Sequence, residues 1–433
     1  MRTPSDLNFR DLVEQHLGSR LPEGLAASVS MENLPDETQR FIVRMLALMK
    51  RSGYSVTEFN PHLLHWFSVT VPGTLPGAWG GRIPPLTMPG RHKKLDDYVA
   101  DDRKDSIKES HLFVDIGCGF PPVTSADTAK RFPDWKILGV DRSFADYVLY
   151  DSDGHYACFD QEGNFIYFQA LMNASGRALY ADPTATQKRF ITLFEELSPM
   201  MQPAHGTGSQ AVEKYGNKLV NNHIRDFETK NLTFVNSDFT ELKLKDVHVI
   251  RCMNVLIYYD PEDRKQFLEK ARRRLVDGGL LITGTNGLGV QTRYTVYRKK
   301  SDKLVPDELA FGLDNIGHIV FMPFFSIQDD DPETNLLADL AGIIRNDRSF
   351  WPDFSKRQDD LLQQNGICQR NSNGFFEFLS DNMSTGEYLK INSRIWQEIG
   401  EEGYIEQAVD VIAKSGYEAW KNSVGDIAVK LPA

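Results

Sequence analysis

Two glycines and a later acid form the pattern in this sequence that is best suited to binding chemistry. Gly117 and Gly119 follow an apolar run over residues 112–116, and Asp141 stands 22 positions after Gly119, at the end of a second apolar run. Glycine lets a backbone turn tightly and approach a ligand closely. An acid at the tip of the second strand can reach the ribose hydroxyls of a nucleotide. The spacing therefore predicts a strand, a glycine turn, a helix over about 125–131 and a second strand over 136–140.

The residues after the two glycines indicate which nucleotide is bound. A dinucleotide fingerprint needs a third glycine or alanine at the position held here by Pro122, so a nicotinamide cofactor is disfavoured. The stretch instead resembles motif I of the class I S-adenosylmethionine (SAM) dependent methyltransferases. The resemblance implies that Asp115 is the acid of the motif and that both glycines lie under the methionine part of SAM. The chain departs from the family's usual third glycine by having Pro121.

Two later segments extend this resemblance. Ser237-Asp238-Phe239 follows an apolar run over 232–236 and is similar to a later motif of the same family, which implies that the Asp238 carboxylate accepts a hydrogen bond from the adenine amino group and that Phe239 packs near the ring. The segment Asn254-Val255-Leu256-Ile257-Tyr258 precedes a predicted helix to about Val276, a Gly-Gly stop and a strand over 280–285. This order resembles the chemotaxis receptor glutamate methyltransferases, and it implies that Asn254 and Tyr258 lie beside the methyl donor. The arginine that this family has before the asparagine is Met253 here.

The resemblance also defines the chemistry that we expect. Methyl transfer from a sulfonium needs alignment of acceptor, methyl and sulfur, so no metal is expected and Tyr258 is the candidate catalytic residue. A carboxylate acceptor is already a nucleophile at neutral pH, whereas a phenol or an amine would need a general base. The candidate bases are four histidines: His92, His111, His155 and His248.

Composition excludes several other classes of protein. With 41% hydrophobic and 25% charged residues, the chain is typical of a globular protein. The formal charge of −11 argues against nucleic acid or an anionic membrane as a partner, and no apolar stretch is long enough for a membrane span. The four cysteines lie far apart, which predicts buried thiols and neither a disulfide framework nor a zinc site. These features predict a cytoplasmic protein.

The sequence suggests three regions. We expect an N-terminal helical region over 1–105, a SAM-binding domain over 106–330 with an insertion at about 144–230, and a C-terminal helical region over 331–433. Residues 71–90 carry five prolines and five glycines with Trp79 and Arg82, and they are interpreted as a loop that closes over the acceptor. The insertion is interpreted either as a surface elaboration or as a substrate cap.

Secondary structure outside the core is predicted from periodicity and turn residues. Helices are expected over 9–17 and 38–51, and again over 186–201 and 210–230, while 155–159 and 165–169 are expected to form a hairpin. Strands are expected over 293–299 and 318–322, with Pro306 arguing against a strand between them. The last hundred residues are expected to be mostly helical, with Phe375, Phe376 and Phe378 in the core.

Together these observations predict an α/β fold with a Rossmann-like methyltransferase sheet. The predicted function is SAM-dependent transfer of a methyl group to a small-molecule or peptide acceptor, at a carboxylate or hydroxyl oxygen. One alternative is a SAM-binding regulatory module without catalysis. The other is a nicotinamide-dependent dehydrogenase.

Overall fold

The computed structural model describes residues 8–26, 29, 31, 34, 36–60, 63–64, 87–142, 144–170, 179, 182–201, 208–287, 291–318, 331–379 and 385–431. The predicted closing loop lies outside these ranges except for residues 87–90, and the predicted strand over 318–322 lies outside them except for His318. The chain forms two compact units, one comprising Pro76–Ile250 and the other comprising Met1–Leu75 with Arg251–Ala433. The three predicted regions stay a prediction.

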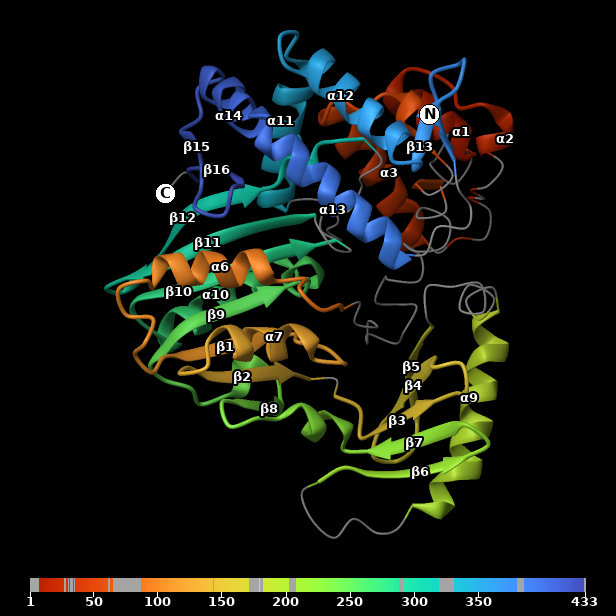
Figure 1. The fold of residues 1–433 in the computed structure, drawn as a ribbon, viewed down its shortest axis with the longest axis vertical. Helices are drawn as coiled ribbons and strands as arrows, with labels where there is room; N and C mark the ends of the chain where they lie inside the picture. Colours follow the sequence, from red (N-terminus) through yellow and green to blue (C-terminus); the bar gives the residue numbers. More distant parts are fainter. Residues whose placement is uncertain are drawn as a thin grey trace. The chain divides into compact units, whose positions relative to one another are not determined.

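The main sheet has nine described strands in the order β15-β16-β12-β11-β10-β9-β1-β2-β8, which Figure 1 labels. The boundary between the two units falls inside β9. Parallel pairing joins β1 to β2 and β2 to β8, while β10, β11, β12, β16 and β15 pair antiparallel in that order. This is a mixed Rossmann-like α/β sheet, as predicted. Its strands are β1 (Leu112–Ile116), β2 (Lys136–Asp141), β8 (Leu232–Asn236), β9 (Val247–Met253), β10 (Leu275–Asn286), β11 (Thr292–Lys300), β12 (Lys303–Phe311), β15 (Ala419–Lys421) and β16 (Ile427–Val429).

The parallel part of the sheet begins with the predicted strand, turn, helix and strand. Strand β1 leads through the glycine turn into α7 (Val123–Arg131), which returns the chain to β2. Helix α6 (Lys93–Asp102) packs on α7, where the buried Thr128 hydroxyl donates to the Asp96 carboxylate at 3.1 Å. Strand β1 is buried along nearly its whole length, which fits its sequence: it is apolar without alternation, apart from the buried Asp115.

The insertion after β2 forms a second sheet of five antiparallel strands in the order β5-β4-β3-β7-β6. Helix α9 (Pro183–Leu197) lies along this sheet (Figure 1). Its Phe190 and Phe194 pack with Leu149, Phe159 and Phe168. These elements confirm the hairpin predicted from residues 155–159 and 165–169 and the helix predicted over 186–201. The strands are β3 (Tyr147–Tyr150), β4 (Tyr156–Phe159), β5 (Phe165–Gln169), β6 (Gln210–Lys214) and β7 (Asn217–Asn221).

The predicted helix over 210–230 is wrong. Residues 210–221 form the hairpin of β6 and β7, followed by a short 3-10 helix, η6 (His223–Phe227). The hairpin turns at Tyr215 and Gly216, which both have positive φ, 53° and 78°. Two positive φ values match the right-handed twist of a two-residue hairpin. Pairing of β7 with β3 outweighs the helix propensity of the glutamine, alanine, glutamate and lysine in this stretch.

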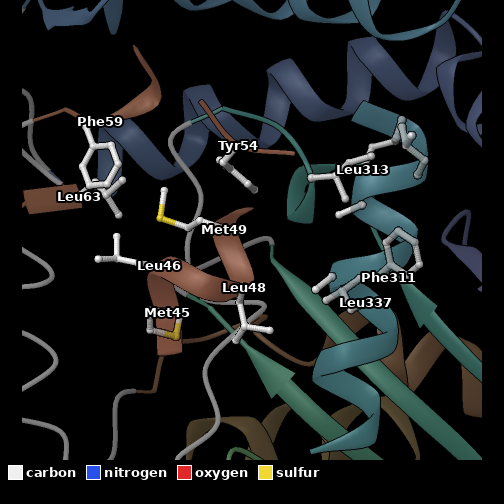
Figure 2. Close-up of a cluster of buried hydrophobic side chains, with 14 of the residues drawn as sticks. Met45, Leu46, Leu48, Met49, Tyr54, Phe59, Leu63, Phe311, Leu313 and Leu337 are labelled. Carbon is white, nitrogen blue, oxygen red and sulfur yellow. The ribbon is translucent and has the colours of Figure 1, made fainter. Parts of the chain in front are cut away.

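The unit formed by Met1–Leu75 and Arg251–Ala433 has a core that joins the two ends of the chain. Side chains of α3 (Asp36–Arg51) gather with Phe311, Leu313 and Leu337, the last of these from α11 (Pro332–Asn346) (Figure 2). The helices predicted near the N-terminus are confirmed. The other helices of this unit are α1 (Phe9–Leu17), α2 (Glu23–Ala26), α10 (Pro261–Arg274), α12 (Trp351–Gln364), α13 (Thr385–Glu401) and α14 (Tyr404–Lys414), with short 3-10 turns η2 (Val56–Glu58), η8 (Leu256–Tyr258) and η9 (Leu313–Asn315).

A buried ion pair ties the N-terminal part of this core to α11. The Arg345 guanidinium pairs with the Glu58 carboxylate, and it also donates to the Ile316 carbonyl at 2.6 Å. The guanidinium carbon lies 3.8 Å from the ring centroid of Tyr54 and 4.0 Å from that of Trp351. Burial is the largest influence on Glu58 and opposes its ionisation. The charge of Arg345, the hydrogen bond and charge of His318 and the charge of Arg370 together outweigh burial, so the pKa of Glu58 lies below its usual value.

The C-terminal region is mostly helical, as predicted, and Phe375 and Phe376 lie in the core. Strands β13 (Cys368–Arg370) and β14 (Phe376–Phe378) form a small hairpin between α12 and α13. The expectation that Pro306 prevents a strand is wrong, since β12 runs through it. The ladder with β11 shifts register between Val296 and Tyr297, opposite Pro306, and β16 pairs only with Leu309–Phe311. A bulge at an edge tolerates the missing N–H of proline.

Candidate functional site

The glycine turn after β1 has the backbone conformation that its two glycines permit. Gly117 and Gly119 have φ values of +69° and +66°, in the left-handed region that residues with a side chain rarely adopt. Gly117 is exposed, and its N–H donates to the Val140 carbonyl at 2.8 Å. The Phe120-Pro121 peptide bond that follows is cis. The turn thus presents exposed backbone at the carboxyl end of β1.

The side chain of Asp141 meets this turn from the neighbouring strand. Its Oδ2 accepts a hydrogen bond from the Gly119 N–H at 2.9 Å. Asp141 is the last residue of β2 and pairs in register with Asn236, the last residue of β8. The carboxyl ends of β1, β2 and β8 therefore lie together, which is where an open parallel sheet binds its ligand.

Asp115 lies below this edge, inside the sheet. It is buried, and its Oδ2 accepts a hydrogen bond of 2.6 Å from the Ser125 hydroxyl at the start of α7. Burial, together with the carboxylates of Asp141 and Asp115, raises the pKa of the neighbouring Cys118 thiol well above its usual value. Asp115 therefore joins β1 to α7, and Cys118 is held as a neutral thiol.

Close packing under the turn depends on a glycine that sequence analysis did not single out. A Cβ at Gly139 would lie 2.5 Å from the Phe234 ring and 3.2 Å from Cys118 Sγ. Gly139 pairs with Asp115 in the sheet, so the absent side chain lets β8 and the turn approach β2. In the sequence, the glycine inside an otherwise apolar strand could have indicated this close packing.

Asp238 and Phe239 follow β8 at the same edge. The Asp238 carboxylate caps the 3-10 helix η7 (Phe239–Glu241), accepting from the Thr240 N–H at 2.7 Å. Phe239 is buried, with 4% of its surface exposed. Asp238 is half-buried, and it lies two residues after Asn236, the residue that pairs with Asp141 in the sheet.

Asn254 belongs to the other unit and holds two strand ends together there. It has a left-handed φ of 58°, and its backbone N–H donates to the Gly284 carbonyl at 2.8 Å. Its side-chain Oδ1 accepts from the Asn286 N–H at 2.9 Å, and its Nδ2 donates to the Asn286 carbonyl at 3.3 Å. The amide thus continues the pairing of β9 with β10 by one residue, and it fixes the path of the segment that follows.

Tyr258 ends the short helix η8 in this segment. Its ring packs against the hydrophobic core of its unit, and burial raises the pKa of its hydroxyl. Arg264 of α10 holds the segment by donating to the Leu256 carbonyl at 3.0 Å and pairing with Asp331 at 3.4 Å. Tyr258 therefore has a fixed place and a protonated hydroxyl at neutral pH.

One family model matches a segment that includes the ends of β8 and β9. Residues 203–301 match the family model described as "CheR methyltransferase, SAM binding domain". Residues 203–301 are therefore similar to the SAM-binding domain of methyltransferases. The matched segment includes β8, β9, α10 and β10, hence also Asp238, Phe239, Asn254 and Tyr258. No curated protein matches the sequence.

Several solved structures that resemble part of this chain are methyltransferases. A SAM-dependent methyltransferase from Clostridium acetobutylicum is 12% identical over 51% of this chain and 65% of its own, with a TM-score of 0.21. PKMT2 from Rickettsia typhi in complex with AdoHcy is 13% identical over 47% and 27%, with a TM-score of 0.23. Magnesium protoporphyrin IX methyltransferase from Synechocystis PCC 6803 with bound SAH is 15% identical over 45% and 55%, with a TM-score of 0.21. The chain spans less than two thirds of each.

The residues at this edge of the sheet fit SAM as a cofactor. An exposed glycine backbone at Gly117 and carboxylates at two adjacent strand ends, Asp141 and Asp238, suit a ligand that carries an amino acid, a ribose and an adenine. Within the described ranges, no helix combines the length and apolar character that a membrane crossing requires.

One cluster of the insertion has the residue types of a metal site, but its contacts argue against a metal. Asp151, Asp153 and His155 bring possible ligand atoms within 4.8 Å of one another. Asp151 Oδ1 already accepts from the N–H groups of Asp153 and His155, and Oδ2 pairs with Arg189 at 2.8 Å. The arginine supplies the positive charge that the buried carboxylate needs.

Two of the histidines considered as bases in the sequence, His111 and His248, lie at the end of their strands opposite the glycine turn. His111 precedes β1, with Nε2 2.9 Å from the Ser106 carbonyl, and its ring contacts that of His248 at 4.4 Å. His248 lies near the start of β9, and burial followed by the neighbouring His111 lowers its pKa. Both occupy the amino ends of their strands, opposite the edge where a ligand binds.

Sequence analysis missed a histidine that does lie beside the turn. His223, the first residue of η6, has its ring centroid 5.3 Å from that of Phe120, the residue after Gly119. Its Nδ1 lies 2.9 Å from Asp226 Oδ2. The available signal was His-x-x-Asp, which the mistaken helix over 210–230 concealed.

Proposed function

We propose that this chain transfers a methyl group from SAM to an oxygen atom of a small-molecule or peptide acceptor. The match of residues 203–301 to a SAM binding domain carries this proposal. The shared edge of Gly119, Asp141 and Asp238 supports it, because all three belong to neighbouring strand ends.

The proposed roles follow from the positions of the residues. Asp141 would hold the ribose hydroxyls, and Gly117 and Gly119 would lie against the methionine part. Asp238 would accept from the adenine amino group, with Phe239 beside the ring. Asp115 would act indirectly, since its hydrogen bond to Ser125 fixes the turn. SAM, when bound, supplies an electrophilic methyl group.

Asn254 and Tyr258 are proposed to border the methyl group from the segment after β9. The double hydrogen bond of Asn254 to Asn286 supports a positioning role, because it fixes the backbone leading to Tyr258. Tyr258 is proposed to contact the transferring methyl with its ring or hydroxyl. The proposal includes no metal. It also includes a cytoplasmic location, which the four free and buried cysteines support.

Labelled SAM tests the proposed function. The full chain is incubated with methyl-labelled SAM and fractionated cell extract, and binding of SAM and of NAD is measured in parallel by calorimetry. We expect SAM binding and label transfer to at least one fraction. Binding of SAM without transfer to any fraction would indicate the regulatory module instead. Binding of NAD in place of SAM would indicate a dehydrogenase.

A further inference from the structure

The insertion contributes aromatic side chains to the immediate neighbourhood of the glycine turn. Five residues form what we call the aromatic cluster: Phe120, Tyr150, Tyr156, His223 and Phe227. The Phe120 ring centroid lies 6.0 Å from that of Tyr156 and 5.9 Å from that of Phe227. The His223 ring lies 5.8 Å from Tyr150 and 5.6 Å from Phe227. Every member belongs to the Pro76–Ile250 unit.

The sheet of the insertion directs Tyr150 and Tyr156 toward the turn. Tyr150 and Tyr156 are register partners on adjacent strands, on the face opposite to the one that packs on α9. The Tyr156 hydroxyl donates to the Phe120 carbonyl at 3.1 Å. This bond attaches the insertion to the residue that follows Gly119. The insertion is therefore part of the site edge and is more than a surface elaboration.

Within this cluster, His223 and Asp226 are arranged as a dyad. Asp226 Oδ2 lies 2.9 Å from His223 Nδ1, and the Ser209 hydroxyl donates to the other oxygen of the same carboxylate. Such a carboxylate favours the tautomer with the proton on Nδ1 and leaves Nε2 as an acceptor. In the described part of the chain, Nε2 of His223 has no hydrogen-bond partner, and 18% of the side chain is exposed.

We propose that His223 is the general base of this methyltransferase, that Asp226 orients it, and that the acceptor is a phenolic hydroxyl held against the aromatic cluster. This inference rests on the proposed function. The phenol proton goes to Nε2 of His223, the phenol oxygen bonds to the methyl carbon, and the carbon-sulfur bond breaks with its electron pair remaining on sulfur. A carboxylate acceptor would have no proton to give and no use for such a base.

The surrounding groups suit a planar aromatic acceptor. Tyr150, Tyr156 and Phe227 are each half-buried, so each of these aromatic residues keeps some exposed surface. Among the residues that the structure describes, the titratable groups in contact with His223 are Asp226 from its own helix and Tyr150 from β3. Burial, followed by the nearby Cys158 and Asp226, raises the pKa of Tyr150 to about 12, so Tyr150 is neutral when the histidine works.

The test combines the chemical nature of the product with variants of the dyad. The native chain, His223→Gln and Asp226→Asn are incubated with methyl-labelled SAM and fractionated extract, and the product is treated with mild alkali. Arg225→Gln is the matched control, because it breaks an exposed ion pair with Glu228 on the same short helix and leaves the dyad intact. A readout independent of turnover is the pH titration of the His223 imidazole by NMR, in the presence and absence of catechol.

We expect a label that resists alkali, as an aryl ether does. Turnover should fall about 100-fold or more in His223→Gln, the usual size of general base catalysis, and by less in Asp226→Asn. SAM affinity and the melting temperature should change little in both. The lower limb of the pH profile of kcat/KM should disappear in His223→Gln, and catechol should shift the His223 titration of the native chain.

Other results would overturn the inference in distinguishable ways. A label released by alkali as methanol would identify a methyl ester, which refutes the phenol and the base while the proposed function stands. An alkali-stable product formed at an unchanged rate by His223→Gln would refute the base alone. Absence of transfer to any fraction by a chain that binds SAM would refute the proposed function itself.

Discussion

Replacing Asp141 tests whether the edge of the sheet binds SAM as inferred. The carboxylate has two tasks in this proposal, because Oδ2 accepts from the Gly119 N–H at 2.9 Å and the group would also accept from ribose hydroxyls. Asp141→Ala removes both. Asp141→Asn keeps a neutral oxygen of nearly the same size that can still accept from Gly119, so the pair of variants separates the charge from the shape of the turn.

The magnitude follows from the type of bond that is lost. A hydrogen bond to a charged group contributes about 1.5–3 kcal/mol, so Asp141→Ala should weaken SAM binding by about 10- to 150-fold. Neutral hydrogen bonds contribute about 0.5–1.5 kcal/mol, so Asp141→Asn should lose only part of that affinity. The Asp141→Ala variant lacks the hydrogen bond to the Gly119 N–H both with and without SAM. Loss of this bond therefore changes the SAM affinity only if SAM binding stiffens the turn.

Calorimetry with SAM on the native chain and both variants measures this effect. Asp160→Ala is a suitable control, since Asp160 caps the turn of a hairpin in the same unit through the Asn164 N–H at 2.8 Å, with no proposed contact to SAM. Circular dichroism verifies that each variant is folded. An unchanged affinity in folded Asp141→Ala would refute the assignment of the ribose site to this edge.

Three further predictions concern other parts of the chain. Tyr258→Phe should lower the single-turnover rate more than SAM affinity; a normal rate with a lower melting temperature would mean that the ring only packs in the core. Arg345→Met should lower the free energy of unfolding by about 3–5 kcal/mol in urea, because the buried Glu58 carboxylate loses its arginine partner and keeps His318, whose Nδ1 lies 3.4 Å from Oε2. Since the folded-state pKa of Glu58 is depressed, native stability should be full above its unfolded pKa and fall as pH drops through the folded value; an identical pH dependence in Arg345→Met would contradict this pairing. Burial raises the thiol pKa of Cys118, and it raises those of Cys158 and Cys368 to about 12, so a thiol reagent should label all four cysteines only after denaturation, and rapid labelling of the native chain would show that the thiols are accessible.

The parts of the fold that could be predicted from sequence depend on local geometry. Gly117 and Gly119 need left-handed backbone, and a strand, a short helix and a second strand of fixed lengths bring Asp141 back beside them. These constraints act within about thirty residues, so spacing alone was informative. The cap of α10 by Asp260, with Pro261 at the first helical position, is of the same kind.

The missed features depend on pairing between distant segments. Strands β6 and β7 form because β3 offers an edge to β7, and nothing within residues 210–221 specifies that partner. The bulge opposite Pro306 is likewise a property of two strands. His223 comes beside Phe120 only after the insertion has folded, so its sequence neighbours could not reveal its position.

The pairing of Glu58 with Arg345 also constrains how the chain can fold during synthesis. The two residues are 287 positions apart, and Arg51 pairs with Asp339 across 288. At a synthesis rate of about 5–20 residues per second, the apolar face of α3 waits roughly 15–60 s for its partners on α11. The Pro76–Ile250 unit emerges in that interval and has its own contacts to form. Folding of this chain is therefore expected to begin in the middle and to close at the ends, with Phe41, Met45 and Met49 as the surface that a chaperone would cover meanwhile.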